Sequence, residues 1–249
     1  MRAGAIWPPP EASARWLRLE LQTPQAAVGS EPPTGAYALN SLEIESLSFG
    51  ETPTTFMRAV AEESRRGLYP RGFVGEQPYW TLVGVDGGGE SGLIGEDGAI
   101  ELRRGGPSIE PFVLDNGRLV SWADVQIGQS QQDGDLPIPT VTWASDDWTL
   151  AITAFAEGVP ERAQLYGQYV LTNTSKRPRT LTLALMARPF QVNGPSQFLA
   201  IPGGVGPIEQ IDWNGSTLVL NDAIRRACLR TPTAAATRAS ARWSRTARP

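Results

Sequence analysis

The sequence predicts an all-β protein whose main part is a large antiparallel β-sandwich. Short runs of apolar, aromatic and β-branched residues recur along most of the 249-residue chain, and clusters of turn-forming residues separate them. The 26 glycines and 21 prolines agree with a chain that turns often. Only one stretch has the spacing of an amphipathic helix. Many short strands at fairly even spacing are typical of a sandwich.

Two strands are predicted near the N-terminus, after a linker or ragged start over residues 1–13 that contains a proline triplet. Apolar and charged residues alternate over Arg15–Leu21, and a similar pattern covers Tyr37–Leu47. Two strands do not form a stable sheet by themselves. Residues 14–48 are therefore expected to be the end of a β module that needs further strands.

A short helix is predicted within residues 49–68, where it would link the two β regions. Thr52 suits the N-cap and Pro53 suits the first helical position, while Gly67 follows two arginines as a stop signal. The residues that share one face at helical spacing are Phe56, Ala59, Val60 and Glu63.

The sandwich is expected over residues 69–222, where strand patterns follow one another closely. Turn signals separate them, and the strongest is the Asn116-Gly117 dipeptide, which favours a two-residue hairpin. The predicted strands are Tyr79–Val85, Ser91–Ile94, Ala99–Leu102, Ile109–Leu114, Arg118–Ile127, Thr140–Trp143, Trp148–Ala156, Gln164–Thr172, Thr180–Pro189 and Ser216–Asn221.

The most regular part of this region is Leu165–Val192. Leu181, Leu183 and Leu185 alternate with smaller or polar residues, which places the leucines on one buried face of a strand. The turn-forming residues of Asn173–Pro178 come before this strand, and they follow a run rich in aromatic and β-branched residues. The two strands are therefore predicted to pair as one long β-hairpin.

Residues 223–249 differ in composition from the rest of the chain. They contain seven arginines and no Asp or Glu, whereas the whole chain carries a net charge of −4. They show no clear hydrophobic period, so we expect this basic tail to be disordered. We interpret it as an out-of-frame or truncated end that replaces a longer continuation. Binding of an anionic partner is the alternative interpretation.

Composition also disfavours several classes of catalytic site. The chain has no histidine, which excludes serine–histidine–aspartate and cysteine–histidine catalysis as well as histidine metal sites. Its one cysteine, Cys228, excludes an intramolecular disulfide and a cysteine-cluster metal site. No cofactor and no metal are therefore predicted, and any catalysis would have to rest on carboxylates.

The acidic net charge argues against a general nucleic-acid binder, which usually presents a basic surface. No apolar run in the sequence suits a signal peptide or a membrane span. The location is therefore open, with the cytoplasm as the default, unless an upstream portion carries an export signal.

Glu110 and Asp124 are the most interesting carboxylates because both lie within otherwise apolar strand patterns. Glycoside cleavage needs two carboxylates about 5 to 10 Å apart across the scissile bond, and sequence spacing does not establish that separation. An ion pair with an arginine is the favoured role for each of them. Glu96 and Asp97 fall in a predicted turn, where acidic residues commonly make local hydrogen bonds.

Trp143 and Trp213 are the candidate carbohydrate contacts, since both lie near predicted turns and an exposed indole ring can stack on a sugar face. Three further tryptophans lie inside strand patterns and are expected in the core: Trp80, Trp122 and Trp148.

Two parts of the chain resemble known families. The segments RWLRLEL and YALNSLEIESL resemble the last strands of a discoidin domain, a coagulation-factor-type C sandwich that binds carbohydrate or lipid. This resemblance covers residues 14–48. The ligand-binding loops of such domains lie mostly in parts that this stretch does not include, so no binding residue is carried over.

A larger resemblance covers residues 69–222. The segments that carry it are YPRGFVGEQPYWTLVG, SIEPFVL, LVSWADV, DLPIPTVTW, LAITAFAEG and YVLTNTS followed by LMARPFQV. In this order they are similar to the N-terminal supersandwich domain of glycoside phosphorylases and glucoamylase-like hydrolases. The order of both modules resembles bacterial discoidin-domain-containing proteins. In such enzymes an (α/α)₆ helical domain follows the supersandwich and carries the general acid.

The resemblance implies a non-catalytic β-sandwich portion of a carbohydrate-active multidomain protein, which packs against a missing glycoside-active domain. A carbohydrate and that domain are the partners it implies. Two alternatives stay open. One is a self-sufficient glycosidase that uses Glu110 and Asp124, and the other is a lectin-like module that uses Trp143 or Trp213.

Overall fold

The computed structural model describes residues 46–196, 202–213, 217–221, 224–230 and 237–244. The chain divides into two compact units, residues 1–52 and 53–249. The described part of the first unit holds one 3₁₀-helix, η1 (Leu47–Phe49). The strands predicted within residues 14–48 lie outside the described residues, apart from Ser46 and Leu47 at the end of the second strand, and Leu47 belongs to η1.

The second unit begins with the predicted helix, α1 (Pro53–Glu62), which starts at the predicted proline. The helix ends earlier than predicted, five residues before Gly67, and Ala61 is its buried residue. Glu63, which was expected on the helical face, is exposed beyond the helix. The remaining helices are single 3₁₀ turns: η2 (Arg71–Phe73), η3 (Trp122–Asp124) and η4 (Pro160–Arg162).

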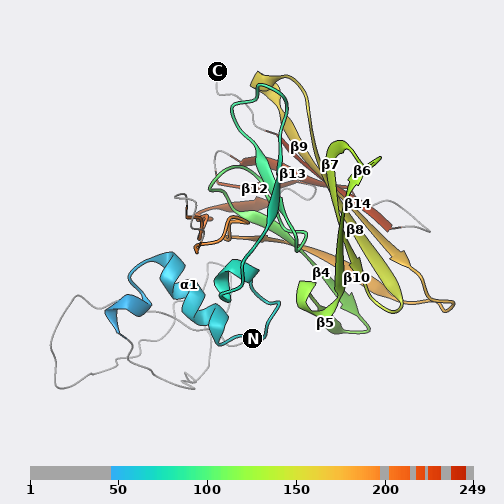
Figure 1. Ribbon diagram of the computed structural model, residues 1–249, viewed down its shortest axis with the longest axis horizontal. Coiled ribbons are helices and arrows are strands. Elements are labelled where there is room, and N and C mark those ends of the chain that lie inside the picture. The colour runs from blue at the N-terminus through green and yellow to red at the C-terminus, as the bar shows by residue number, and fades with distance from the viewer. Residues whose placement is uncertain (1–45, 197–201, 214–216, 222–223, 231–236, 245–249) are drawn as a thin grey trace, which may run out of the picture. The chain divides into compact units, whose positions relative to one another are not determined.

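Two antiparallel sheets make up most of this unit (Figure 1). The six-stranded sheet has the order β1-β2-β3-β4-β10, with β5 paired to β4. Its strands are β1 (Trp80–Val83), β2 (Gly92–Gly95), β3 (Ile100–Glu101), β4 (Ser108–Asp115), β5 (Arg118–Val120) and β10 (Leu181–Arg188).

The eight-stranded sheet has the order β11-β12-β13-β14-β9-β8-β7-β6. Its strands are β6 (Gln126–Gln132), β7 (Leu136–Ala144), β8 (Trp148–Glu157), β9 (Gln164–Asn173), β11 (Ile211–Trp213), β12 (Thr217–Leu220), β13 (Ile224–Arg230) and β14 (Thr237–Ser244).

One hydrophobic core joins the two sheets. Ile100, Ile109 and Val113 of the six-stranded sheet are buried in the same cluster as Leu150 and Ile152 of the eight-stranded sheet. Because successive side chains of a strand point to opposite faces, each sheet buries one face against the other. The prediction of an all-β antiparallel sandwich is therefore confirmed.

A smaller cluster covers the opposite face of β4. It contains Ala61 of α1, Phe73 of η2 and Phe190, with Tyr69 and Val205 packed against them. All residues of β4 from Ser108 to Val113 are buried, because the main core covers one face and Arg188, which contacts the rings of Phe112, Phe190 and Tyr69, lies on the other. This second layer explains how an acidic residue of β4 comes to be buried.

The predicted hairpin of Leu165–Val192 is wrong in its pairing, although both of its strands are present. β9 pairs with β8 and β14 in the eight-stranded sheet, whereas β10 pairs with β4 in the six-stranded sheet. The turn chemistry between them is real, since the Asn173 side chain bonds both the Ser175 amide and the Arg177 carbonyl. Alternation identifies the buried face of a strand but not its neighbour, so the sequence did not reveal this crossing between sheets.

The Asn116-Gly117 hairpin is confirmed. It joins β4 to β5, and Asn116 and Gly117 have φ of 50° and 80°, as a two-residue turn with left-handed backbone requires. The predicted strand Arg118–Ile127 is interrupted, because η3 separates β5 from β6. Ser121 and Asp124 form a capping box at η3, and this local bonding competes with the extended backbone.

The structure also differs from the prediction of a disordered tail. Its backbone forms β13 and β14, and β14 pairs with β9 over eight residues. Backbone hydrogen bonding to an open strand edge does not depend on side-chain periodicity, which is why the composition of the tail did not indicate these strands.

Candidate functional site

Glu110, the first candidate catalytic carboxylate, is held in a buried ion pair. Glu110 is 5% exposed, and Arg188 Nη1 donates a 2.8 Å hydrogen bond to Glu110 Oε2. Ser108 Oγ donates to the other carboxylate oxygen at 3.3 Å. Burial raises the pKa of Glu110, and the Arg188 charge opposes that rise. The favoured role of an ion pair with an arginine is therefore present.

Aromatic rings surround the Arg188 guanidinium in this pair. Its centre lies 4.5 Å from the ring centroid of Phe190 and 5.1 Å from that of Tyr69. Arg188 Nη1 also donates to the Leu68 carbonyl at 2.6 Å. The charge is thus matched by Glu110 and enclosed by rings of the small cluster outside β4.

Asp124, the second candidate carboxylate, serves as a cap. Its Oδ2 accepts hydrogen bonds of 2.9 Å from both the amide and the hydroxyl of Ser121. Its Oδ1 lies 3.4 Å from Arg65 and from Arg118. Partial burial acts to raise the pKa of Asp124, but the Ser121 hydrogen bonds and the arginine charges outweigh it and lower the pKa. Glu110 and Asp124 share no hydrogen-bond partner within the described ranges.

The two candidate tryptophans have different environments. Trp143 is 0% exposed, and its indole N–H donates to the Asp97 carbonyl at 3.0 Å. Its ring therefore offers no surface to a sugar, because its strand β7 turns this side chain into the core. Trp213 of β11 is 57% exposed, so its ring is accessible to a sugar. Trp122 and Trp148 are buried as expected, whereas Trp80 is only partly buried.

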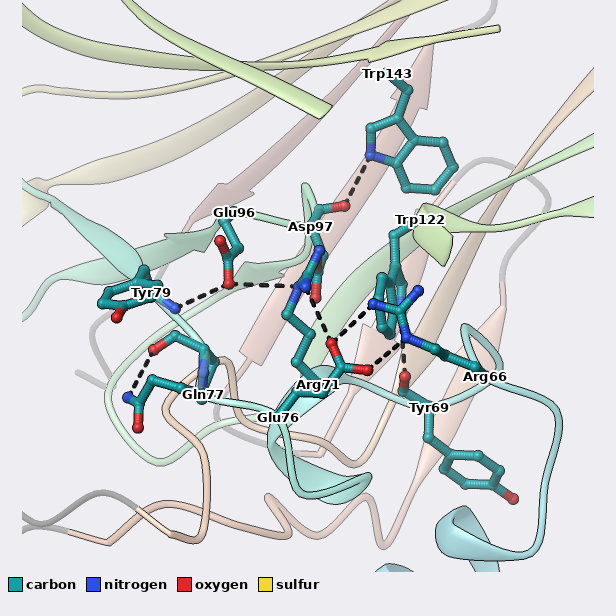
Figure 2. A network of polar contacts seen from close by, with 11 residues as sticks. Arg66, Tyr69, Arg71, Glu76, Gln77, Tyr79, Glu96, Asp97, Trp122 and Trp143 are labelled. Atoms are coloured by element: carbon teal, nitrogen blue, oxygen red, sulfur yellow. Dashed lines mark hydrogen bonds and ion pairs between the residues drawn. The ribbon is translucent and has the colours of Figure 1, made fainter. Parts of the chain in front are cut away.

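A network of two arginines and three carboxylates lies beside the core, and we refer to Arg66, Arg71, Glu76, Glu96 and Asp97 as the arginine–carboxylate network (Figure 2). Arg71 Nε lies 2.5 Å from Asp97 Oδ1 and 3.4 Å from Glu96 Oε1, and its Nη1 lies 3.1 Å from Glu76. Arg66 binds Glu76 with two nitrogens, at 2.5 and 2.8 Å. The three carboxylates exceed the two arginines by one negative charge.

Trp122 forms the floor under both arginines. Their guanidinium centres lie 4.5 Å (Arg66) and 4.4 Å (Arg71) from the Trp122 ring centroid. The Trp122 indole N–H donates to the Tyr69 carbonyl at 3.1 Å, which fixes the ring. Cation–π contact and carboxylate bonding together hold the two like charges close to each other.

Asp97 is the most buried carboxylate of this network. Its side chain is 12% exposed, and burial raises its pKa to about 6, against the lowering effect of Arg71. The turn that carries it packs tightly on the eight-stranded sheet. Gly98 has φ of +86°, and a Cβ at this position would lie 2.3 Å from Ile152 Cδ1, so the turn requires glycine here.

A pocket of about 170 Å³ adjoins this network at Glu96. It lies between β1 and β2 of one sheet and β6 and β7 of the other. The residues that line it are Trp80, Thr81, Ile94, Gly95, Glu96, Gln129, Ser130, Gln131, Pro139, Thr140 and Val141. We refer to it as the rim pocket, because β1 and β6 each form one edge of their sheet.

The sequence did not reveal the arginine–carboxylate network for a specific reason. The sequence pattern predicted that Glu96 and Asp97 make local hydrogen bonds in a turn, and the turn is present. Their main partner, however, is Arg71, which lies 26 residues from Asp97 in the sequence. No motif or spacing links these positions, so only the folded chain brings them together.

The described ranges contain no group of three or more carboxylate, histidine or cysteine side chains arranged to hold a metal ion. Among the described helices, none has the length and apolar character needed to cross a bilayer. No protein-family model, curated protein or solved structure matches this chain.

Proposed function

We propose that this chain is the non-catalytic β-sandwich portion of a carbohydrate-active multidomain protein and that it packs against an (α/α)₆ glycoside-active domain. The Glu110–Arg188 ion pair carries the non-catalytic part of this proposal. A carboxylate bound to a guanidinium at 2.8 Å and enclosed beneath aromatic rings contributes to packing. Asp124, engaged with Ser121 and two arginines, has a structural role as well.

An exposed apolar pair supports the packing part of the proposal. Ile211 and Trp213 are 58% and 57% exposed and lie on one face of β11, because they are two residues apart on a strand. β11 is an edge strand of the eight-stranded sheet. Large exposed apolar side chains at such a place are typical of a surface that another domain covers.

Product release from the isolated chain tests the non-catalytic role. We expect no sugar release from nitrophenyl glycosides, with or without inorganic phosphate, because neither predicted carboxylate is free to act as acid or nucleophile. Release that is lost in Glu110→Gln or Asp124→Asn, with the fold retained by circular dichroism, would instead establish a self-sufficient glycosidase.

The packing role requires a partner domain, and the downstream DNA tests whether such a domain is encoded. Read in all three frames, it should encode a long helical continuation of the kind found in an (α/α)₆ domain. A continuation without helical periodicity in any frame would contradict that part of the proposal.

A lectin-like carbohydrate-binding module is the second candidate, and the exposure of Trp213 is the observation that favours it. Calorimetric titration with oligosaccharides distinguishes the two. The scaffold role predicts weak binding or none. Micromolar binding that Trp213→Ala abolishes would favour the lectin-like module.

A further inference from the structure

We infer that the rim pocket is a binding site for a small, neutral, polyhydroxylated ligand of the size of one sugar ring. The inference goes beyond the scaffold role and does not depend on it, because it rests on the lining of the pocket alone. Binding and product release are also measured separately, so the two proposals fail independently.

The first argument is the change of character along the inner face of β6. Ile127 pairs with Trp143, and Gln129 pairs with Val141, so Gln129 lies on the same sheet face as the buried Trp143 and Val141. Gln131 follows on the same face. An inner face that begins apolar at Ile127 therefore becomes polar where the pocket opens.

The second argument is that the side-chain amides of Gln129 and Gln131 are available for hydrogen bonding to a ligand. The side chains of Gln129 and Gln131 make no hydrogen bond to any residue that the structure describes, and both are exposed. Each amide supplies two donors and one acceptor oxygen. Paired donors and acceptors of this kind match the hydroxyl groups of a polyol, which both donate and accept.

The third argument is a positioned acceptor at the other wall. Glu96 Oε1 accepts the Tyr79 amide at 3.3 Å and lies 3.4 Å from Arg71 Nε. Glu96 Oε2 has no hydrogen-bond partner within the described ranges. One oxygen thus anchors the carboxylate while the other is left for a hydroxyl donor, and the anchoring reduces the entropy lost on binding.

Trp80 and the pocket volume define the class of ligand. Trp80 is one of the residues that line the pocket; it is partly buried, and its indole N–H makes no hydrogen bond to any residue that the structure describes. An indole ring at such a place can contact the C–H face of a sugar. A volume of about 170 Å³ is below the range of about 300 to 1,000 Å³ of drug-sized sites. The Glu96 charge disfavours anionic ligands such as sugar phosphates.

Titration of the full chain, followed by the indole N–H resonances in ¹H–¹⁵N spectra, tests this site. The probes are glucose, glucose 6-phosphate and glucosamine. We expect glucose to shift the Trp80 resonance, identified with Trp80→Phe, with a dissociation constant on the order of millimolar, as befits a few exposed hydrogen bonds. Glucose 6-phosphate should bind more weakly.

Matched variants of β6 provide the control. Gln129→Ala and Gln131→Ala should each weaken glucose binding roughly threefold to tenfold through the loss of one or two hydrogen bonds. Gln126→Ala and Gln132→Ala change glutamines of the same strand that do not line the pocket, and they should leave binding unchanged.

Three outcomes would overturn the inference. One is the absence of a saturable Trp80 shift with glucose, and another is equal weakening by all four glutamine variants. The third is binding of glucosamine alone, lost in Glu96→Gln, which would identify an ammonium site in place of a polyol site.

Discussion

Arg179 binds both carboxylate oxygens of Asp115 at 2.8 Å, at the place where the chain crosses from one sheet to the other. The same guanidinium contacts Asp147 in the turn between β7 and β8. Asp115 ends β4 of the six-stranded sheet, so one arginine connects both sheets beside the segment that joins β9 to β10.

Arg179→Met is expected to lower the midpoint of thermal unfolding, because it leaves two carboxylates without their shared cation. Arg177→Met is the matched control, since Arg177 is exposed and its guanidinium makes no ion pair with a described residue. Hydrogen bonding from Arg179 lowers the pKa of Asp115, so this stabilisation is present above the ordinary Asp pKa of about 4 and is lost as pH falls through the lowered value. Equal midpoints for the two variants would contradict this role.

The raised pKa of Asp97 predicts that the free energy of unfolding changes between pH 5 and pH 7.5. Its pKa of about 6 in the folded state lies above the unfolded value of about 4, so its contribution is largest at low pH and is lost as pH rises through about 6. From this group alone, the free energy of unfolding should be about 1 kcal/mol higher at pH 5 than at pH 7.5.

Urea denaturation of Asp97→Asn at both pH values isolates this contribution from that of other carboxyls. The variant should show a smaller difference between the two pH values than the unmodified chain. Asp146→Asn, which changes an exposed aspartate, should retain the full difference. An unaltered pH dependence in Asp97→Asn would show that Asp97 titrates in its ordinary range.

Trp122 and Trp213 form a matched pair for testing the floor of the arginine–carboxylate network. Trp122→Ala should lower the free energy of unfolding by about 3 to 5 kcal/mol, because it removes a buried ring that also supports two guanidinium groups. Trp213→Ala should change it by less than about 0.5 kcal/mol, since that ring is exposed in the isolated chain. Similar losses in both variants, measured by urea denaturation, would argue against the distinction.

Local signals in the sequence predicted the fold class, the helix and many of the strands. The Asn116-Gly117 turn and the start of α1 at Pro53 depend on backbone preferences of one or two residues, and both are present. The glutamine-rich β6 was not predicted along its length, because its inner face is not consistently apolar. The pairing of β10 with β4 depends on contacts between distant segments, which no local pattern encodes.

The site was less accessible from sequence for the same reason. The burial of Glu110 was suggested by the apolar residues around it, and its arginine partner was expected in kind but not by position. Trp143 was placed at the end of a predicted strand, near a turn, although β7 continues through it and its ring is buried. Glu96 gains its importance only from Arg71 and the edge strands around it.

A double-mutant cycle on Glu110 and Arg188 tests most directly the claim that the Glu110 carboxylate stabilises the fold. Glu110→Gln and Arg188→Met should each lower the free energy of unfolding by about 3 to 5 kcal/mol, because each leaves one member of a buried ion pair uncompensated. The double variant should lose less than the sum of the two. Single variants as stable as the unmodified chain, with strictly additive effects, would contradict the structural role of Glu110.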